Sequence, residues 1–346
     1  MKRFTAFVLA LLMMLSFTSV SAGAVSLSVG KNNLEKQFAY GEGPKTQGYI
    51  LDYRYFSPVN VEEDTTKYPV VIWLHGHSHG QYDGYQIKSN NITNWASDEF
   101  QSRFSESGGA YIVAVRAPEN IGISWGEDLI EPLKRTIDDF IMKNIDNVNP
   151  SKIYAGGFSL GGMMTFEMAM AYPEMFAAIF PVCPYITLNN EDAMKFSDVP
   201  VWLTSGKNDH LVSYSGRVMK DWNAIVNTTS VKEISRLSTL EIVCKPDGLP
   251  APSGHYSWEA VTNDMFSNKN SDYPYMKTVS ATGEEVKLIY PEGMISWLDS
   301  FTSEYTSEDI ILSDDNDGSI SFFARLKGVF MVIYIFFRNL FRPITG

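Results

Sequence analysis

Residues 152–172 have the sequence KIYAGGFSLGGMMTFEMAMAY, and this stretch decides the fold. Its first four residues are predicted to form a short strand, and residues 160–172 a helix that Pro173 ends. Between them lies Gly157-Phe158-Ser159-Leu160-Gly161, which matches the pattern G-x-S-x-G. On the order of one chain in ten contains this pattern by chance, so the interpretation depends on its position between a strand and a helix. In that position, the pattern is typical of a nucleophilic serine on a sharp turn.

Strand-like and helix-like segments alternate on both sides of this turn. Helical periodicity predicts an amphipathic helix over 127–145, and another helix is predicted over 214–226. The predicted strands are residues 49–56 (antiparallel), 69–74, 111–115, 152–155, 177–182, 201–204 and 239–243. This alternation predicts an α/β fold with a mostly parallel central sheet and helices on both faces. Ligands of such sheets bind at the carboxyl ends of the strands.

A serine nucleophile needs a base to accept its proton and a carboxylate to orient that base. Both residue types follow Ser159. Asp209 lies in a loop after one predicted strand, and His255 lies in a glycine-containing loop after the last core strand. His210 is a poorer base, because it is adjacent to Asp209 and could not easily be oriented by it. Asp264 is a weaker candidate than Asp209, because it follows His255 in the sequence, whereas the usual chain order of such a triad on an α/β sheet is serine, aspartate, histidine. We therefore predict a catalytic triad of Ser159, Asp209 and His255.

A tetrahedral intermediate also needs hydrogen-bond donors that face the developing oxyanion. The backbone N–H groups of Leu160 and His77 are the candidates for this oxyanion hole. His77 belongs to the loop His75-Gly76-His77-Ser78-His79-Gly80, whose alternating histidines suggest an alternative, a metal site formed by His75, His77 and His79. The glycines and the missing carboxylate favour the oxyanion loop. We therefore expect no metal and no cofactor.

Aromatic residues lie in several loops near the predicted site. Trp125, Tyr185 and Trp258 are candidates for the lining of a substrate pocket, although aromatic residues at such positions more often fill the core.

Several segments resemble a known group of enzymes. Residues 53–55 and 68–76, then 156–162, 205–209 and 254–258, occur in the same order as in secreted esterases and predicted peptidases related to prolyl oligopeptidase, feruloyl esterase and polyhydroxybutyrate depolymerase. The resemblance extends from about residue 49 to about residue 301. It implies the α/β-hydrolase fold and hydrolysis of a carboxylic ester or an amide. Small-molecule or polysaccharide-linked esters are the first substrate class that it suggests, and peptides are the second.

The chain departs from this group in its histidine-rich loop, in an insertion at about 262–290 and in its C-terminal tail. The first departure affects the expected oxyanion geometry, and the others affect access to the site. We predict a catalytic domain over residues 25–303, which includes the insertion.

The N-terminus has the layout of a signal peptide. Lys2 and Arg3 precede an apolar stretch at 4–15, and small residues follow at Ala22-Gly23-Ala24. We expect residues 1–24 to direct export to the extracellular space or cell surface. An uncleaved membrane anchor is the alternative.

At the C-terminus, an acidic linker over 304–318 precedes a hydrophobic, basic tail over 319–346. The wholly apolar run 328–337 is shorter than the roughly 20 residues of a full membrane span. Its flanking basic residues suit an interfacial helix, so the tail could contact a membrane. Packing against the enzyme or a partner is the alternative.

The composition excludes some classes of partner. The formal net charge is −12, which disfavours binding to nucleic acid. The chain has two cysteines, Cys183 and Cys244, which we expect to be buried thiols and not a disulfide. Two functions of another class stay open: a metal-dependent hydrolase, and a non-catalytic protein that binds a surface.

Overall fold

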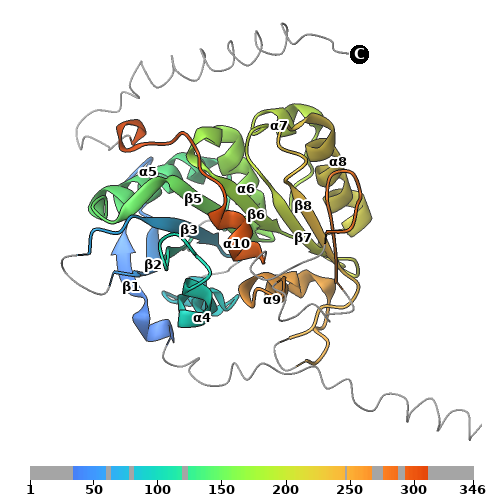
Figure 1. Ribbon diagram of the computed structural model, residues 1–346, viewed down its shortest axis with the longest axis horizontal. Helices are drawn as coiled ribbons and strands as arrows, with labels where there is room; N and C mark the ends of the chain where they lie inside the picture. The colour runs from blue at the N-terminus through green and yellow to red at the C-terminus, as the bar shows by residue number, and fades with distance from the viewer. Residues whose placement is uncertain are drawn as a thin grey trace, which may run out of the picture. The chain divides into compact units, whose positions relative to one another are not determined.

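A nine-stranded, mostly parallel sheet organises the part of the chain that the structure describes (Figure 1). The structure is a computed structural model, and it describes residues 34–59, 64–77, 82–118, 124–245, 248–266, 276–286 and 293–310. The strand order is β1-β2-β4-β3-β5-β6-β7-β8-β9. The strands are β1 (Ala39–Glu42), β2 (Asp52–Phe56), β3 (Tyr68–Leu74), β4 (Tyr111–Val115), β5 (Val148–Phe158), β6 (Ala178–Val182), β7 (Trp202–Gly206), β8 (Arg236–Leu240) and β9 (Met276–Val279).

Strands β3 to β8 run parallel to one another, whereas β1, β2 and β9 pair antiparallel at the two edges. The parallel strands are buried because helices cover both faces. In β3 and β4 every residue is buried, which explains why their sequences are continuous apolar runs.

Helices α5, α6, α7 and α8 lie on one side of the sheet, and α4 and α9 lie on the other (Figure 1). The described α-helices are α3 (Tyr85–Lys88), α4 (Asp98–Gln101), α5 (Ile130–Lys143), α6 (Leu160–Ala171), α7 (Asn190–Met194), α8 (Met219–Thr228), α9 (Trp258–Thr262) and α10 (Met294–Asp299). Short 3₁₀ turns are η1 (Glu35–Gln37), η2 (Ile92–Ala96), η3 (Glu127–Leu129), η4 (Pro173–Met175), η6 (Gly254–Ser257) and η8 (Ser307–Asp309), and η5 (Tyr214–Val218) is a π turn.

Aromatic side chains fill the layer between the sheet and α9. Phe180 of β6 stacks on Trp73 of β3, with ring centroids 6.1 Å apart, and on Trp95, at 5.4 Å. The indole N–H of Trp95 donates to the carbonyl oxygen of Val261 in α9. Each such ring contributes roughly 1.5–3 kcal/mol of burial free energy, so this stack fixes α9 beneath the centre of the sheet.

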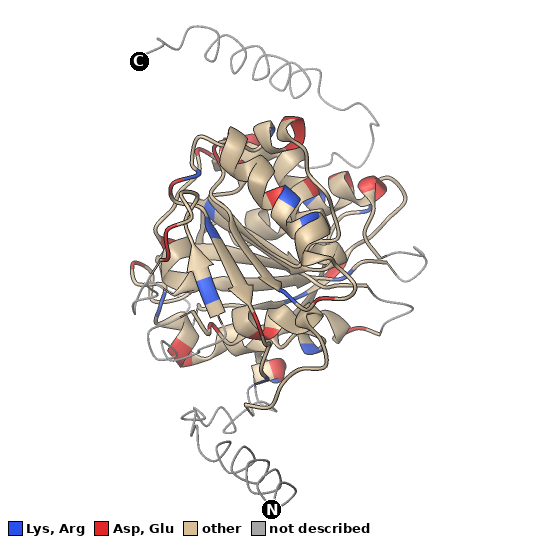
Figure 2. Cartoon of the chain, turned by 90° about the vertical axis from the view of Figure 1, so that its right-hand side faces the viewer, with Lys and Arg blue, Asp and Glu red and all other residues tan. Residues whose placement is uncertain are grey.

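Charged residues lie mostly on helices and loops, with both signs interspersed (Figure 2). A buried ion pair joins α4 to α9 on the side of the sheet that these two helices cover. Arg103, just after α4, pairs with Asp264, just after α9. Asp264 also accepts the backbone N–H of Met294 at 3.1 Å, so it ties α10 to the same cluster.

The predicted α/β fold with a mostly parallel sheet and helices on both faces is confirmed. The prediction placed the last core strand at 239–243, whereas β8 spans Arg236–Leu240. Within the predicted insertion, β9 adds an antiparallel edge strand to β8, and a bridge between Val279 and Glu285 closes a hairpin.

Both predicted targeting segments lie outside the described residues: the signal peptide at 1–24 and the tail at 319–346. Of the predicted acidic linker, the structure describes residues 304–310. Among the helices in the described ranges, none combines the length and the apolar character needed to cross a membrane.

Candidate active site

Ser159 lies on a sharp turn between β5 and α6. Its backbone has φ 58° and ψ −114°, a conformation that costs free energy for a residue with a side chain. The flanking glycines allow the turn to approach the end of β3. A Cβ on Gly157 would lie 2.8 Å from the carbonyl oxygen of Leu74, and a Cβ on Gly161 would overlap the same atom. The two glycines of the G-x-S-x-G pattern are therefore required by close backbone packing.

Three backbone hydrogen bonds hold Ser159 at the carboxyl end of the sheet. Its N–H donates to the carbonyl oxygen of Val182 at 2.9 Å. Its own carbonyl oxygen accepts the N–H groups of Met163 and Tyr185, each at 3.0 Å. The turn is thus bonded to the end of β6 as well as to its own helix, at the edge of the sheet where ligands of such folds bind.

Asp209 lies in the loop after β7, and three donors fix both oxygens of its carboxylate. Oδ1 accepts the backbone N–H groups of Leu211 and Val212, each at 2.8 Å. Oδ2 accepts Nδ1 of His255, also at 2.8 Å. The side chain of Asp209 is fully buried, so this orientation is protected from water.

His255 lies in η6, after β8, with its side chain 11% exposed. A carboxylate only accepts hydrogen bonds, so Nδ1 carries the proton and Nε2 is left as the basic atom. Burial lowers the pKa of His255, but the hydrogen bond to Asp209 and the neighbouring Cys183 thiol raise it, and the net pKa lies above the ordinary value. These surroundings favour the imidazolium that a general base forms when it accepts a proton.

A second pair of glycines brings the loops of Asp209 and His255 together. A Cβ on Gly206 would lie 2.5 Å from the Cα of Gly254, and a Cβ on Gly254 would lie 2.6 Å from the backbone nitrogen of Asp209. On the other side, the ring of Phe158 lies 5.0 Å from the ring of His255. Phe158 directly precedes Ser159, so the turn that carries Ser159 lies next to the loop of His255. A catalytic contact between Ser159 and His255 stays a prediction.

Known proteins match this architecture. A model of the phospholipase/carboxylesterase family matches residues 116–233, a stretch that contains Ser159 and Asp209. The protein named "Putative esterase NocK", from Nocardia uniformis subsp. tsuyamanensis, is 30% identical over 103 residues, which are 29% of this chain and 30% of that protein. A solved structure described as a thermostable esterase has a TM-score of 0.54 and 23% identity, over 67% of this chain and 61% of its own. The chain has the α/β-hydrolase fold. Pyrococcus horikoshii acylaminoacyl peptidase is more distant, with a TM-score of 0.40 and 16% identity over 55% of this chain and 35% of its own.

In this α/β-hydrolase fold, Leu160 is the first residue of α6, and the first N–H groups of a helix have no acceptor within it. The N–H of Leu160 is thus left without an acceptor inside its own helix. His77, the second predicted oxyanion donor, is exposed, and its carbonyl oxygen accepts the hydroxyl of Tyr85 at 3.3 Å. The contribution of both N–H groups to an oxyanion hole stays a prediction.

His75 is a structural residue of the α/β-hydrolase core. Its Nε2 accepts the N–H of Ala117 at 3.1 Å, so Nδ1 carries the proton and donates to the carbonyl oxygen of Gly76 at 2.6 Å. Burial lowers the pKa of His75 to about 4, which keeps the ring neutral. Both ring nitrogens are therefore engaged, and this arrangement disfavours the alternative metal site. His79, another member of that site, lies outside the described residues.

The predicted pocket residues have different surroundings. Trp125 is fully buried and its indole N–H donates to the carbonyl oxygen of His75, so in this structure it offers no surface to a substrate. Trp258 is 8% exposed and packs on Phe158 with ring centroids 4.1 Å apart. Tyr185 is 45% exposed, and the guanidinium of Arg217 lies 4.5 Å from its ring centroid. Tyr185 and Trp258 therefore stay candidates for the pocket.

Asp264 and the cysteines can also be placed. Asp264, the weaker carboxylate candidate, forms an ion pair with Arg103 and not with His255. Both cysteines are buried and neither forms a disulfide, as expected. Sequence reasoning missed that Cys183 belongs to the site, although its position directly after a predicted strand was a usable signal.

Cys183, Asp209 and His255 each place one potential metal-ligand atom of the side chain within 4.8 Å of the other two. Such a group can be spaced to hold a metal ion, but here the carboxylate and the imidazole are bonded directly to each other. This direct hydrogen bond favours an acid–base pair over a metal site.

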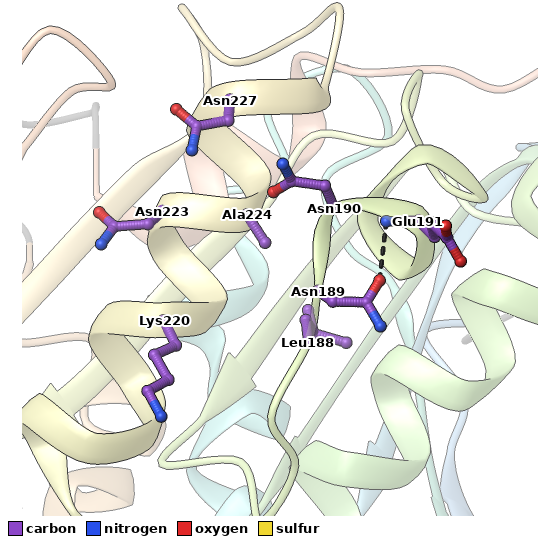
Figure 3. A pocket seen from close by; sticks show the side chains of 8 residues that line it. All are labelled: Leu188, Asn189, Asn190, Glu191, Lys220, Asn223, Ala224 and Asn227. Atoms are coloured by element: carbon purple, nitrogen blue, oxygen red, sulfur yellow. Dashed lines mark hydrogen bonds between the residues drawn. The ribbon is translucent and has the colours of Figure 1, made fainter.

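A shallow groove of about 620 Å³ lies between α7 and α8 (Figure 3). Six of the eight residues that line it are polar or charged, and the full set is Leu188, Asn189, Asn190, Glu191, Lys220, Asn223, Ala224 and Asn227. None of the three predicted triad residues lines this groove. One wall of the groove is formed by residues 188–191, which follow Cys183 closely in the chain.

Proposed function

We propose that this protein is an exported serine hydrolase that cleaves carboxylic esters through a covalent intermediate on Ser159. The observation that carries the proposal is the 2.8 Å hydrogen bond between Nδ1 of His255 and Asp209, beside the strained turn of Ser159. A serine on such a turn, a buried histidine with a free Nε2 and a carboxylate are the parts that nucleophilic acyl transfer requires. They also follow the chain order Ser, Asp, His that is usual for this fold.

The reaction would proceed in two halves. Oγ of Ser159 attacks the ester carbonyl carbon while Nε2 of His255 accepts the hydroxyl proton, and the N–H groups of Leu160 and His77 stabilise the oxyanion. Collapse of this intermediate breaks the bond to the alcohol, which leaves with the proton from His255. Water then repeats the attack on the acyl group, and the carboxylic acid is released from Ser159. Asp209 holds the imidazole throughout, and no cofactor takes part.

Small-molecule or polysaccharide-linked esters are the proposed substrates. The name of the thermostable esterase and the carboxylesterase family model support this class. A serine peptidase of prolyl oligopeptidase type is the alternative within the same chemistry. We further propose that residues 1–24 direct export and that the tail at 319–346 contacts a membrane at the cell surface.

The proposal can be tested with a substrate panel on the purified protein. We expect hydrolysis of p-nitrophenyl acetate and butyrate, and slower or no hydrolysis of a peptidyl p-nitroanilide. Ser159→Ala should abolish the activity, whereas the exposed Ser215→Ala should leave it unchanged. A protein that hydrolyses the anilide faster than every ester would support the peptidase instead.

Treatment with EDTA separates the remaining functions. The triad needs no metal, so we expect full activity after chelation. Activity that EDTA removes and that Ser159→Ala retains would favour a metal-dependent hydrolase. A folded protein that cleaves nothing in the panel, and that retains affinity for a polysaccharide, would favour the non-catalytic binding protein.

A further inference from the structure

Cys183 occupies a special position at the end of β6. It is fully buried, and its N–H donates to the carbonyl oxygen of Thr204 in β7 at 2.8 Å. Its backbone has φ 34°, a value that residues with a side chain rarely adopt. Such strain persists only where the surrounding structure requires it, and it often marks a functional position.

The side chain of Cys183 is directed at the loop that carries the proposed base. Sγ lies 3.5 Å from the carbonyl oxygen of His255, so the thiol donates a hydrogen bond to that backbone. Sγ also lies within 4.8 Å of one carboxylate oxygen of Asp209 and of one ring nitrogen of His255. The thiol therefore lies beside the acid–base pair on the β6 side, where the N–H of Ser159 donates to Val182.

The His255 loop has few other attachments near the imidazole. The N–H of His255 donates to Oγ of Ser253, within its own loop, at 3.1 Å. The N–H of Gly254 donates to the carbonyl oxygen of Asn208 at 3.4 Å, close to the limit of a hydrogen bond. The thiol thus supplies an attachment of the His255 backbone to a different strand of the sheet.

We propose that Cys183 is a positioning residue of the triad, whose thiol fastens the backbone of His255 so that the imidazole stays between Asp209 and Ser159. This inference rests on the proposed function. Cys183 does not touch the substrate and does not replace Ser159 as nucleophile. Because the thiol also favours the protonated imidazole, its removal should lower the pKa of His255 as well as loosen the ring.

The chain offers a matched control. Cys244 is a second buried thiol, and it lies after β8. We expect Cys183→Ala to reduce kcat about tenfold with little change in KM, because orientation and not substrate binding is lost. Cys183→Ser, which keeps a donor, should retain kcat within about threefold, and Cys244→Ala should resemble the wild type.

A titration of His255 by NMR in the full-length variants gives a readout that does not depend on catalysis. We expect Cys183→Ala to lower the pKa of His255 by about half a unit, the shift that corresponds to one weak hydrogen bond, and Cys244→Ala to leave it unchanged. An unchanged pKa and kcat in folded Cys183→Ala would overturn the inference. So would equal losses in Cys183→Ala and Cys244→Ala. If the wild type hydrolyses no ester, the proposed function fails, and the titration still decides whether the thiol acts on His255.

Discussion

Replacement of Asp209 by asparagine tests the orientation of the proposed base. The change keeps the shape of the side chain and removes its charge. Oδ1 of Asp209 accepts two backbone N–H groups, from Leu211 and Val212. The asparagine must therefore present its carbonyl oxygen to these donors, and its amide group faces His255. An amide group donates, so the imidazole has to carry its proton on Nε2 and can no longer accept one from Ser159.

The magnitude follows from this change of tautomer. In serine hydrolases with the same arrangement, loss of the correct tautomer costs on the order of 10⁴ in kcat. This factor corresponds to about 5.5 kcal/mol of transition-state stabilisation. The fold should survive, because the asparagine retains both backbone contacts, and loss of a charged hydrogen bond costs about 1.5–3 kcal/mol of the free energy of unfolding.

The assay is steady-state hydrolysis of p-nitrophenyl acetate, with thermal denaturation as the test of folding. Asp221→Asn is a matched control: Asp221 is also buried and also accepts a backbone N–H, from Leu188 at 2.7 Å, but no histidine among the described residues donates to it. Burial raises the pKa of Asp221 to about 7, so asparagine resembles its protonated form, and kcat should change little. A folded Asp209→Asn variant with kcat within about tenfold of the wild type would refute the assignment of Asp209.

Three further outcomes are expected. The base acts only when neutral and the pKa of His255 is raised, so kcat/KM should fall as the pH drops, with a midpoint above the ordinary histidine value; a pH–rate profile flat down to pH 5 would contradict this. Gly161→Ala should lower the free energy of unfolding by about 1–3 kcal/mol or more in chemical denaturation, because its Cβ would overlap the carbonyl oxygen of Leu74; unchanged stability would show that the turn relaxes. Asp264→Ala should cost about 3–5 kcal/mol of stability, because it breaks the buried pair with Arg103, while the folded fraction keeps its kcat; a selective loss of kcat would give Asp264 a catalytic role.

The central strands and the serine turn were predictable because their physical signals are local. Strands β3 and β4 are buried on both faces, which requires continuous apolar runs. The turn at Ser159 requires glycine on both sides, and glycines are visible in a sequence. The prediction of Asp209 and His255 then used the chain order serine, aspartate, histidine, which is usual for this fold.

Other features depend on contacts between distant segments. Strand β9 has four residues with no clear alternation of burial, and only its pairing with β8 makes it a strand. His75 looks like a metal ligand in sequence, but backbone groups of Gly76 and Ala117 occupy its nitrogens. The position of Cys183 directly after a predicted strand places it at the carboxyl end of the sheet, but its proposed role depends on a side-chain direction that goes with a positive φ, which the sequence does not predict.

The central claim is that Ser159 is an activated nucleophile, and covalent labelling tests it most directly. The purified protein would be treated with a fluorophosphonate, and the adduct would be located by intact-mass measurement and peptide mapping. We predict one adduct per chain on the peptide that contains Ser159, at an unchanged rate in EDTA and with no adduct in Ser159→Ala. A folded protein that acquires no adduct, or an adduct that persists in Ser159→Ala, would contradict the triad.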